Sequence, residues 1–131
     1  MRKSFIYITI FLSFSILTYI VISKENAPEF KLKTYYLVFL KSGPKRDQTK
    51  DVAMEIQKGH LANIKRLINQ DNIAIAGPLL DDSEVRGIFI FNAESKEEVE
   101  VLCATDPAIK AGRLIAEVHP WMSEPGNCLP E

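Results

Sequence analysis

The sequence has no excess of charge of either sign and no biased tract, and these absences exclude several classes of protein. Its 16 lysines and arginines are balanced by 17 aspartates and glutamates, for a formal net charge of −1. Because it has no basic stripe and no interleaved aromatic residues, we expect no nucleic-acid partner. It also has no internal repeats. With 47% hydrophobic residues over 131 positions, the composition is that of one small globular domain.

Cysteine is scarce, which excludes a disulfide-rich scaffold. The two cysteines are Cys103, which shares the inward face of a predicted helix with Val99 and Leu102, and Cys128, which follows Gly126 and Asn127. An exported protein could join them in a disulfide, which would tie the C-terminal tail (123–131) to that helix. The alternative is one buried thiol and one free thiol in the tail. The sequence leaves both interpretations open.

Only one long hydrophobic run is present, and it lies at the N-terminus. Arg2 and Lys3 precede the uncharged segment Phe5–Ile22, and polar residues follow it. A basic start before an apolar run is typical of a secretory signal. The run is also about as long as the roughly 18 residues that suggest a membrane-spanning helix. We therefore predict a signal peptide or membrane anchor over 1–23 and a linker over 24–33. The protein is then exported to a periplasmic or other extracytoplasmic space, or is anchored there, with or without cleavage after Ser23.

Strand and helix patterns alternate after the linker and predict a domain over residues 34–122. The order of the predicted elements is strand, helix, strand, strand, helix, strand. Ser95 and Glu98 form a capping box at the start of the second helix. This βαββαβ order is that of the ferredoxin-like α+β fold. The predicted elements are strand Thr34–Lys41, helix Asp51–Gln70, strand Asn72–Ala76, strand Arg86–Asn92, the helix that follows Ser95, and strand Arg113–Val118.

The first predicted helix carries a histidine on its apolar face. His60 lies four residues from both Ile56 and Ile64, so all three side chains face the sheet. A buried ring needs a hydrogen-bond partner, because leaving a polar group unpaired costs about 1–3 kcal/mol. Helical spacing by itself favours a structural histidine that is bonded to a backbone carbonyl. A catalytic histidine is the alternative.

Asp106 also has a structural explanation. An aspartate before proline is a common N-cap, with Pro107 at the first position of a short helix. This role accounts for Asp106 without any chemistry, so neither Asp106 nor His60 indicates a site when it is considered alone.

Four short motifs together resemble the YCII-related domain family over Thr34 to Met122. They are Gly59-His60-Leu61, Ala76-Gly77-Pro78-Leu79, Thr105-Asp106-Pro107-Ala108 and Glu117-Val118-His119-Pro120-Trp121. The resemblance implies a ferredoxin-like fold paired into a dimeric α+β barrel. It also implies a small pocket with His60 and Asp106 as a catalytic pair. Relatives of this kind eliminate hydrogen chloride from chlorinated muconolactone-type compounds. An N-terminal export segment is not typical of the family.

A histidine paired with an aspartate suits general-base chemistry. The carboxylate fixes the imidazole tautomer and leaves the other nitrogen free to take a proton next to a carbonyl. We expect a cofactor-free lyase or isomerase that acts on a small carbonyl or lactone substrate, with Gly77, Pro78 and His119 as further pocket residues. The two histidines follow no metal-ligand spacing, so we expect no metal. A non-catalytic ligand-binding or dimerisation module is the alternative.

Overall fold

The computed structural model describes residues 30–126 and Leu129. The predicted signal or anchor segment and Cys128 lie outside these residues, so export, cleavage and a disulfide to Cys103 stay predictions. Within the described part of the chain, no helix combines the length and apolar character needed to cross a membrane.

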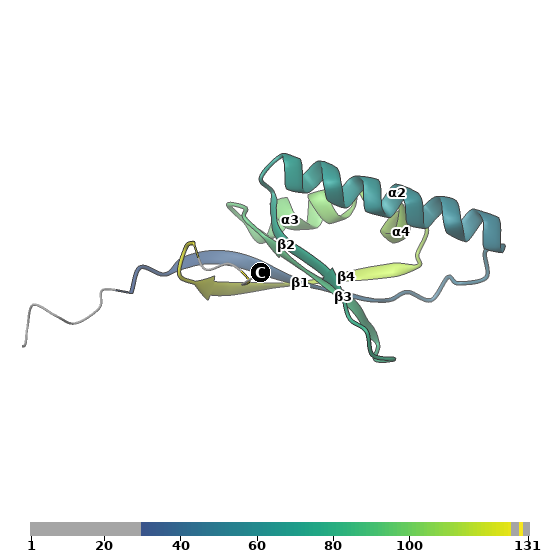
Figure 1. Ribbon diagram of the computed structural model, residues 1–131, viewed down its shortest axis with the longest axis horizontal. Helices are drawn as coiled ribbons and strands as arrows, with labels where there is room; N and C mark the ends of the chain where they lie inside the picture. Colours follow the sequence, from purple (N-terminus) through teal and green to yellow (C-terminus); the bar gives the residue numbers. More distant parts are fainter. Residues whose placement is uncertain (1–29, 127–128, 130–131) are drawn as a thin grey trace, which may run out of the picture. The chain divides into compact units, whose positions relative to one another are not determined.

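The chain forms a four-stranded antiparallel sheet with helices on one face (Figure 1). The strand order is β2-β3-β1-β4, so β3 lies between β1 and β2. This order confirms the predicted α+β class and is consistent with a ferredoxin-like fold. Along the chain the elements are β1 (Lys33–Ser42), α2 (Lys50–Asn69), β2 (Ile73–Pro78), β3 (Val85–Phe91), α3 (Lys96–Cys103), α4 (Pro107–Lys110) and β4 (Leu114–Ser123).

The hydrophobic core lies between the sheet and the helices. Successive residues of a strand point to opposite faces of the sheet, so alternate residues of β1, β3 and β4 face the helices. The side chains that meet in this layer are at most 7% exposed. They are Val38, Leu40, Phe89, Phe91 and Val118 from the strands, Ile73 from β2, Leu67 from α2, and Val99 and Cys103 from α3.

The helix starts follow the chemistry that the sequence predicts. Ser95 accepts a hydrogen bond from the backbone N–H of Glu98 at 3.1 Å, as an N-cap does. The Glu98 carboxylate reaches back to the backbone N–H of Glu94 at 2.8 Å. Asp106 caps α4, with Pro107 in its first turn, as predicted. These caps fix where α3 and α4 begin, and with them the position of Asp106.

The last strand is longer than predicted. The predicted strand ends at Val118, but β4 continues to Ser123 and pairs with β1 along its whole length. Pro120 does not break it, because β4 is an edge strand and a proline there costs no hydrogen bond on its outer side. Pro78 is likewise the last residue of β2, the strand at the other edge of the sheet. Edge position thus explains why both prolines are tolerated.

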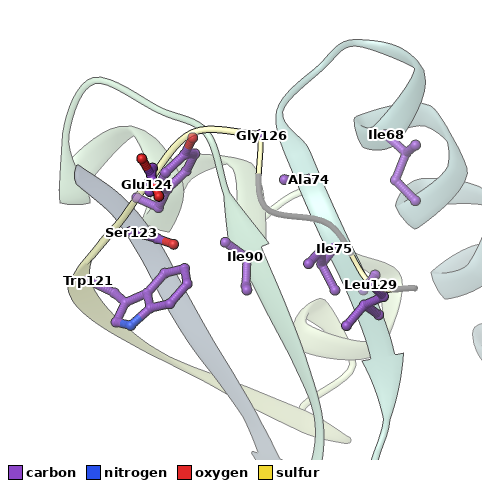
Figure 2. Close-up of a pocket in the computed structure, with 11 residues that line it drawn as sticks. Ile68, Ala74, Ile75, Ile90, Trp121, Ser123, Glu124, Gly126 and Leu129 are labelled. Atoms are coloured by element: carbon purple, nitrogen blue, oxygen red, sulfur yellow. The ribbon is translucent and has the colours of Figure 1, made fainter. Parts of the chain in front are cut away.

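The face of the sheet that the helices leave bare is called the open face below. It carries alternate residues of β1, β3 and β4, among them Tyr35, Phe39, Ile90 and Trp121. The Tyr35 and Trp121 rings lie 6.2 Å apart, and Trp121 is 40% exposed. Figure 2 shows a pocket of about 590 Å³ where this face meets the β2 edge, with Leu129 beside Ile75. The open face therefore carries many apolar side chains, and no helix of the described residues covers it.

Candidate active site

His60 and Asp106 form a buried pair between α2 and α4. The Nδ1 atom of His60 lies 2.6 Å from Oδ2 of Asp106. The two residues are 7% and 1% exposed. They are 46 positions apart in the sequence, so the fold and not local spacing brings them together. His60 is not bonded to a backbone carbonyl, which was the structural alternative.

Two local features hold this pair in place. Asp106 uses its second carboxylate oxygen, Oδ1, to accept the backbone N–H of Ala108 at 2.7 Å. Gly59 lets α2 approach α4, because a Cβ at that position would lie 3.0 Å from Cγ of Pro107. Since Gly59 precedes His60 and Pro107 follows Asp106, the close approach of the helices places the two site residues side by side.

The hydrogen bond fixes the direction in which His60 can act. A carboxylate oxygen only accepts, so the neutral imidazole carries its hydrogen on Nδ1 and keeps a lone pair on Nε2. Nε2 has no hydrogen-bond partner among the described residues. Every fully buried side-chain nitrogen or oxygen of these residues does have a partner, so Nε2 is not a fully buried atom. Nε2 is therefore accessible, and it is the atom of the pair that can take a proton.

His60 lines a cavity of about 460 Å³ between α2 and the sheet. Gly77 and Pro78 lie in its wall, where the sequence places them. The His60 ring stacks near Phe89, with ring centroids 6.3 Å apart. Asp106 is not part of the wall and lies behind His60. The remaining lining is mostly apolar and comprises Leu40, Leu61, Ile64, Ala76, Leu79, Gly87 and Leu114, with the polar residues Arg46, Gln57 and Arg86.

His119 does not lie in this cavity, which corrects the prediction that it lines the same pocket. It follows Val118, whose side chain faces the helices, so strand alternation turns His119 to the open face. There its Nε2 lies 2.7 Å from the Glu117 carboxylate, and its ring packs edge-on against Phe39. Because β4 continues past Val118, strand alternation determines the direction of the His119 side chain.

The sequence does not mark Arg46 as a cavity residue, and it predicts that Arg86 and Arg113 either steer an anionic substrate or lie at solvated strand ends. Arg46 comes from the loop before α2, and nothing in that loop's sequence marks it as part of a site. Arg86 and Arg113 both start predicted strands, yet only Arg86 lines the cavity. Arg113 donates instead to the Gln48 side chain at 2.6 Å. No aspartate or glutamate lines the cavity with these arginines.

Cys103 lies close to the pair in the core but has no nucleophilic character. Burial, and the negative charge of Asp106 after it, raise the pKa of the Cys103 thiol to about 12. The thiol is therefore neutral at physiological pH, and a neutral thiol is a poor nucleophile. Among the described residues no cluster of histidine, cysteine and carboxylate side chains could hold a metal ion.

Comparisons with known proteins agree with this fold. The model of the YCII-related domain matches residues 34–122. Among solved structures, the chain is similar to 5-chloro-2-hydroxyhydroquinone dehydrochlorinase from Burkholderia phenoliruptrix AC1100 in complex with 2,5-dihydroxybenzoquinone. The two share 26% sequence identity with a TM-score of 0.51, over 66% of this chain and 92% of that one. No match was found among curated proteins.

Proposed function

Because the chain belongs to the YCII-related domain family, we propose that it is a cofactor-free lyase or isomerase with His60 as general base. Asp106 orients the imidazole, and a small carbonyl or lactone substrate binds in the cavity. The observation that carries this proposal is the 2.6 Å bond from Nδ1 of His60 to Asp106, which leaves Nε2 accessible beside a cavity of about 460 Å³. The similar dehydrochlorinase supports an elimination reaction.

The proposed reaction is an elimination or a proton shift. Nε2 of His60 takes a proton from a C–H or O–H group of the substrate, and the electron pair left behind forms a new double bond. In an elimination this expels a leaving group such as chloride from the far end. In an isomerisation the proton returns to a different carbon. Asp106 stabilises the imidazolium that forms, and general-base help of this type is worth roughly 10²–10⁴-fold in rate.

A binding module on the same fold is the second candidate. It is favoured by the low exposure of His60 and by the second role of Asp106 as the N-cap of α4, since both fit a structural pair. The two candidates differ in whether a substrate is turned over. Only the enzyme needs a lone pair on Nε2 of His60, because that atom takes the substrate proton.

Replacement of Asp106 by asparagine tests this difference directly. The asparagine has one acceptor oxygen for two donors. If that oxygen keeps the bond to Ala108 N–H, the amide NH₂ faces His60 and forces its hydrogen onto Nε2. We expect Asp106→Asn to fold, to show a protonated Nε2 in ¹⁵N NMR spectra, and to lose about 10²–10⁴-fold in chloride release from 5-chloro-2-hydroxyhydroquinone. His60→Gln should lose as much.

The binding module predicts a different result. His60→Gln and Asp106→Asn then lower the free energy of unfolding but change no reaction. If the wild-type protein turns over neither 5-chloro-2-hydroxyhydroquinone nor a panel of chlorinated lactones, while a ligand still binds in the cavity, the enzyme proposal fails.

We further propose that two copies pair through their open faces, as in a dimeric α+β barrel. The half-exposed aromatic surface around Trp121 supports this pairing, since it would be covered by a second copy. Trp121→Asp should give a monomer in sedimentation experiments, and Lys58→Asp, on the exposed side of α2, should not. A wild-type monomer at high concentration would refute the pairing.

We also propose that segment 1–23 directs export or anchors the chain. The basic Arg2 and Lys3 before the apolar run support this proposal. Fractionation of cells that express the full chain tests it, and the intact mass shows whether cleavage occurs after Ser23. Recovery of the full-length chain in the cytosolic fraction would overturn it.

A further inference from the structure

Two arginines line the cavity, and no carboxylate lines it with them. Arg46 and Arg86 both line the cavity that His60 lines, and no acidic residue does. Among the described residues neither arginine takes part in an ion pair. Asp106, the partner of His60, is buried and does not line the cavity.

Arg46 is anchored where two strand ends meet. Its guanidinium donates to the Ser42 hydroxyl, at the end of β1, and to the backbone carbonyl of Arg113, just before β4, each at 3.2 Å. Both contacts use Nη1, and neither neutralises the charge. The side chain is therefore positioned by neutral acceptors while its remaining N–H groups stay available to a ligand.

Arg86 owes its place to an irregularity in the sheet. Leu40 pairs with Gly87 and Lys41 pairs with Val85, so β3 has one extra residue at Arg86. Strict alternation would turn Arg86 to the open face together with Ile88. A β-bulge re-aims the extra residue, and bulges are common next to active sites. Its one hydrogen bond, at 3.3 Å, goes to the backbone carbonyl of Ser83, which again leaves the charge unpaired.

We infer that Arg46 and Arg86 form an anion subsite, so that the substrate is a small cyclic compound with an acidic group. This inference rests on the proposed function of the same cavity. The apolar wall around Leu40, Phe89 and Leu114 accepts the ring, and the arginines bind its carboxylate or its ionised hydroxyl. Because His60 lies in the same cavity, the anion fixes which carbon or hydroxyl of the ring meets Nε2.

The subsite acts on binding and orientation, not on proton transfer. Loss of either arginine should therefore raise KM with a smaller effect on kcat, whereas loss of His60 should lower kcat. Both arginines are exposed residues, so salt should weaken the interaction. For each arginine we expect about a tenfold loss of affinity, which corresponds to one charge-assisted hydrogen bond of moderate strength.

Binding of matched charged and neutral rings tests the inference without any need for turnover. Benzoate and 4-hydroxybenzoate would be compared with benzamide and 4-hydroxybenzamide, and 2,5-dihydroxybenzoquinone would represent ionised hydroxyl groups. His60 ring signals in NMR titrations report binding. We expect the charged member of a pair to bind at least tenfold more tightly, and we expect 0.5 M NaCl to reduce this preference. Tighter binding of benzoate than of 2,5-dihydroxybenzoquinone would indicate a subsite for a carboxylate. The reverse order would indicate a subsite for an ionised hydroxyl group.

The variants separate this subsite from the catalytic pair. Arg46→Gln and Arg86→Gln should each weaken binding of the charged ring about tenfold, and Lys58→Gln, which removes one positive charge elsewhere, should stay within twofold of wild type. His60→Gln should still bind the charged ring, and backbone amide signals measure this binding because the His60 ring is gone. If the wild-type protein binds the charged ring but catalyses no reaction, only the proposed function is rejected. Equal affinity for charged and neutral rings, no binding of any charged ring, or unchanged binding in both arginine variants would overturn the subsite.

Discussion

The two faces of the sheet are similarly apolar in sequence, but they have different surroundings in the structure. On β1, Val38 and Leu40 face the helices and are 0% and 4% exposed, whereas Leu37 and Phe39 on the open face are only half-buried. A strand with apolar residues on both sides is typical of a sheet that is covered twice. The described chain supplies one cover, and in the proposed pairing a second copy supplies the other.

The polar residues of the two faces differ in the same way. The helix-covered side holds one buried pair, His60 and Asp106, with every buried polar atom satisfied. The open face carries Lys41, Glu117 and His119 as a partly exposed chain of contacts. Buried polar groups require fixed partners, so the covered side is where a side chain can be held in one orientation for chemistry.

The largest contrast between the faces should appear in core truncations. Phe91 is fully buried in the helix-covered core, and Phe91→Ala should lower the free energy of unfolding by about 3–5 kcal/mol. Phe39→Ala on the open face should cost roughly 1–2 kcal/mol in a monomer. Urea unfolding of both variants at low protein concentration measures the difference. Equal losses would mean that the open face is as well packed as the core.

Much of this contrast could be predicted from the sequence. Thr34–Lys41 and Asp51–Gln70 predict β1 and α2 to within one residue at each end, because their apolar patterns are long and regular. The helical wheel also turns His60 inward correctly. Leu61 and Ile68 fall on the same half of the helix by spacing, yet they are 56% and 43% exposed. They lie at the edges of the apolar stripe, where periodicity does not distinguish a buried position from a cavity wall.

A second contrast concerns the reactivity of Cys103 on the covered side. Burial raises the pKa of the Cys103 thiol from its ordinary value of 9.0 to about 12, so its thiolate population at pH 8 should fall by about 10³. Iodoacetamide should label Cys103 about a thousandfold more slowly in the native protein than in urea. Peptide mass spectrometry resolves Cys103 from Cys128. Native labelling within tenfold of the unfolded rate would contradict this burial.

The contact between α2 and α4 should respond to a smaller change. Gly59→Leu must displace Pro107, since even a Cβ would lie 3.0 Å from its Cγ, and should cost about 1–3 kcal/mol. It should also separate His60 from Asp106 and lower turnover. Lys58→Leu, one position earlier and exposed, is the matched control and should stay within about 0.5 kcal/mol. A stable Gly59→Leu with full turnover would show that α2 and α4 need no close approach.

The parts of the site that could not be predicted depend on contacts between distant segments. Arg46 lines the cavity because its loop bonds to the ends of β1 and β4, and no local pattern specifies that geometry. Arg86 depends on a bulge, which shifts the register by one residue. His119 was assigned to the cavity because the predicted strand stopped at Val118. Short motifs therefore identified His60, Asp106, Gly77 and Pro78, but not Arg46 or the direction of His119.

The smallest expected effect lies on the open face, at the ion pair of Lys41 and Glu117. The hydrogen bond from Lys41, and then that from His119, lowers the pKa of Glu117 below its ordinary value of 4.5. A carboxyl whose folded-state pKa is lowered stabilises the fold above pH 4.5 and loses that effect as the pH falls through the lowered pKa. We therefore expect wild type to be slightly more stable than Glu117→Gln at pH 7 and equal to it in strong acid, by urea unfolding at protein concentrations low enough to keep the chain monomeric. Since the pair is exposed, 0.5 M NaCl should shrink the difference at pH 7. A large difference that resists salt would mean instead that Glu117 is buried in solution.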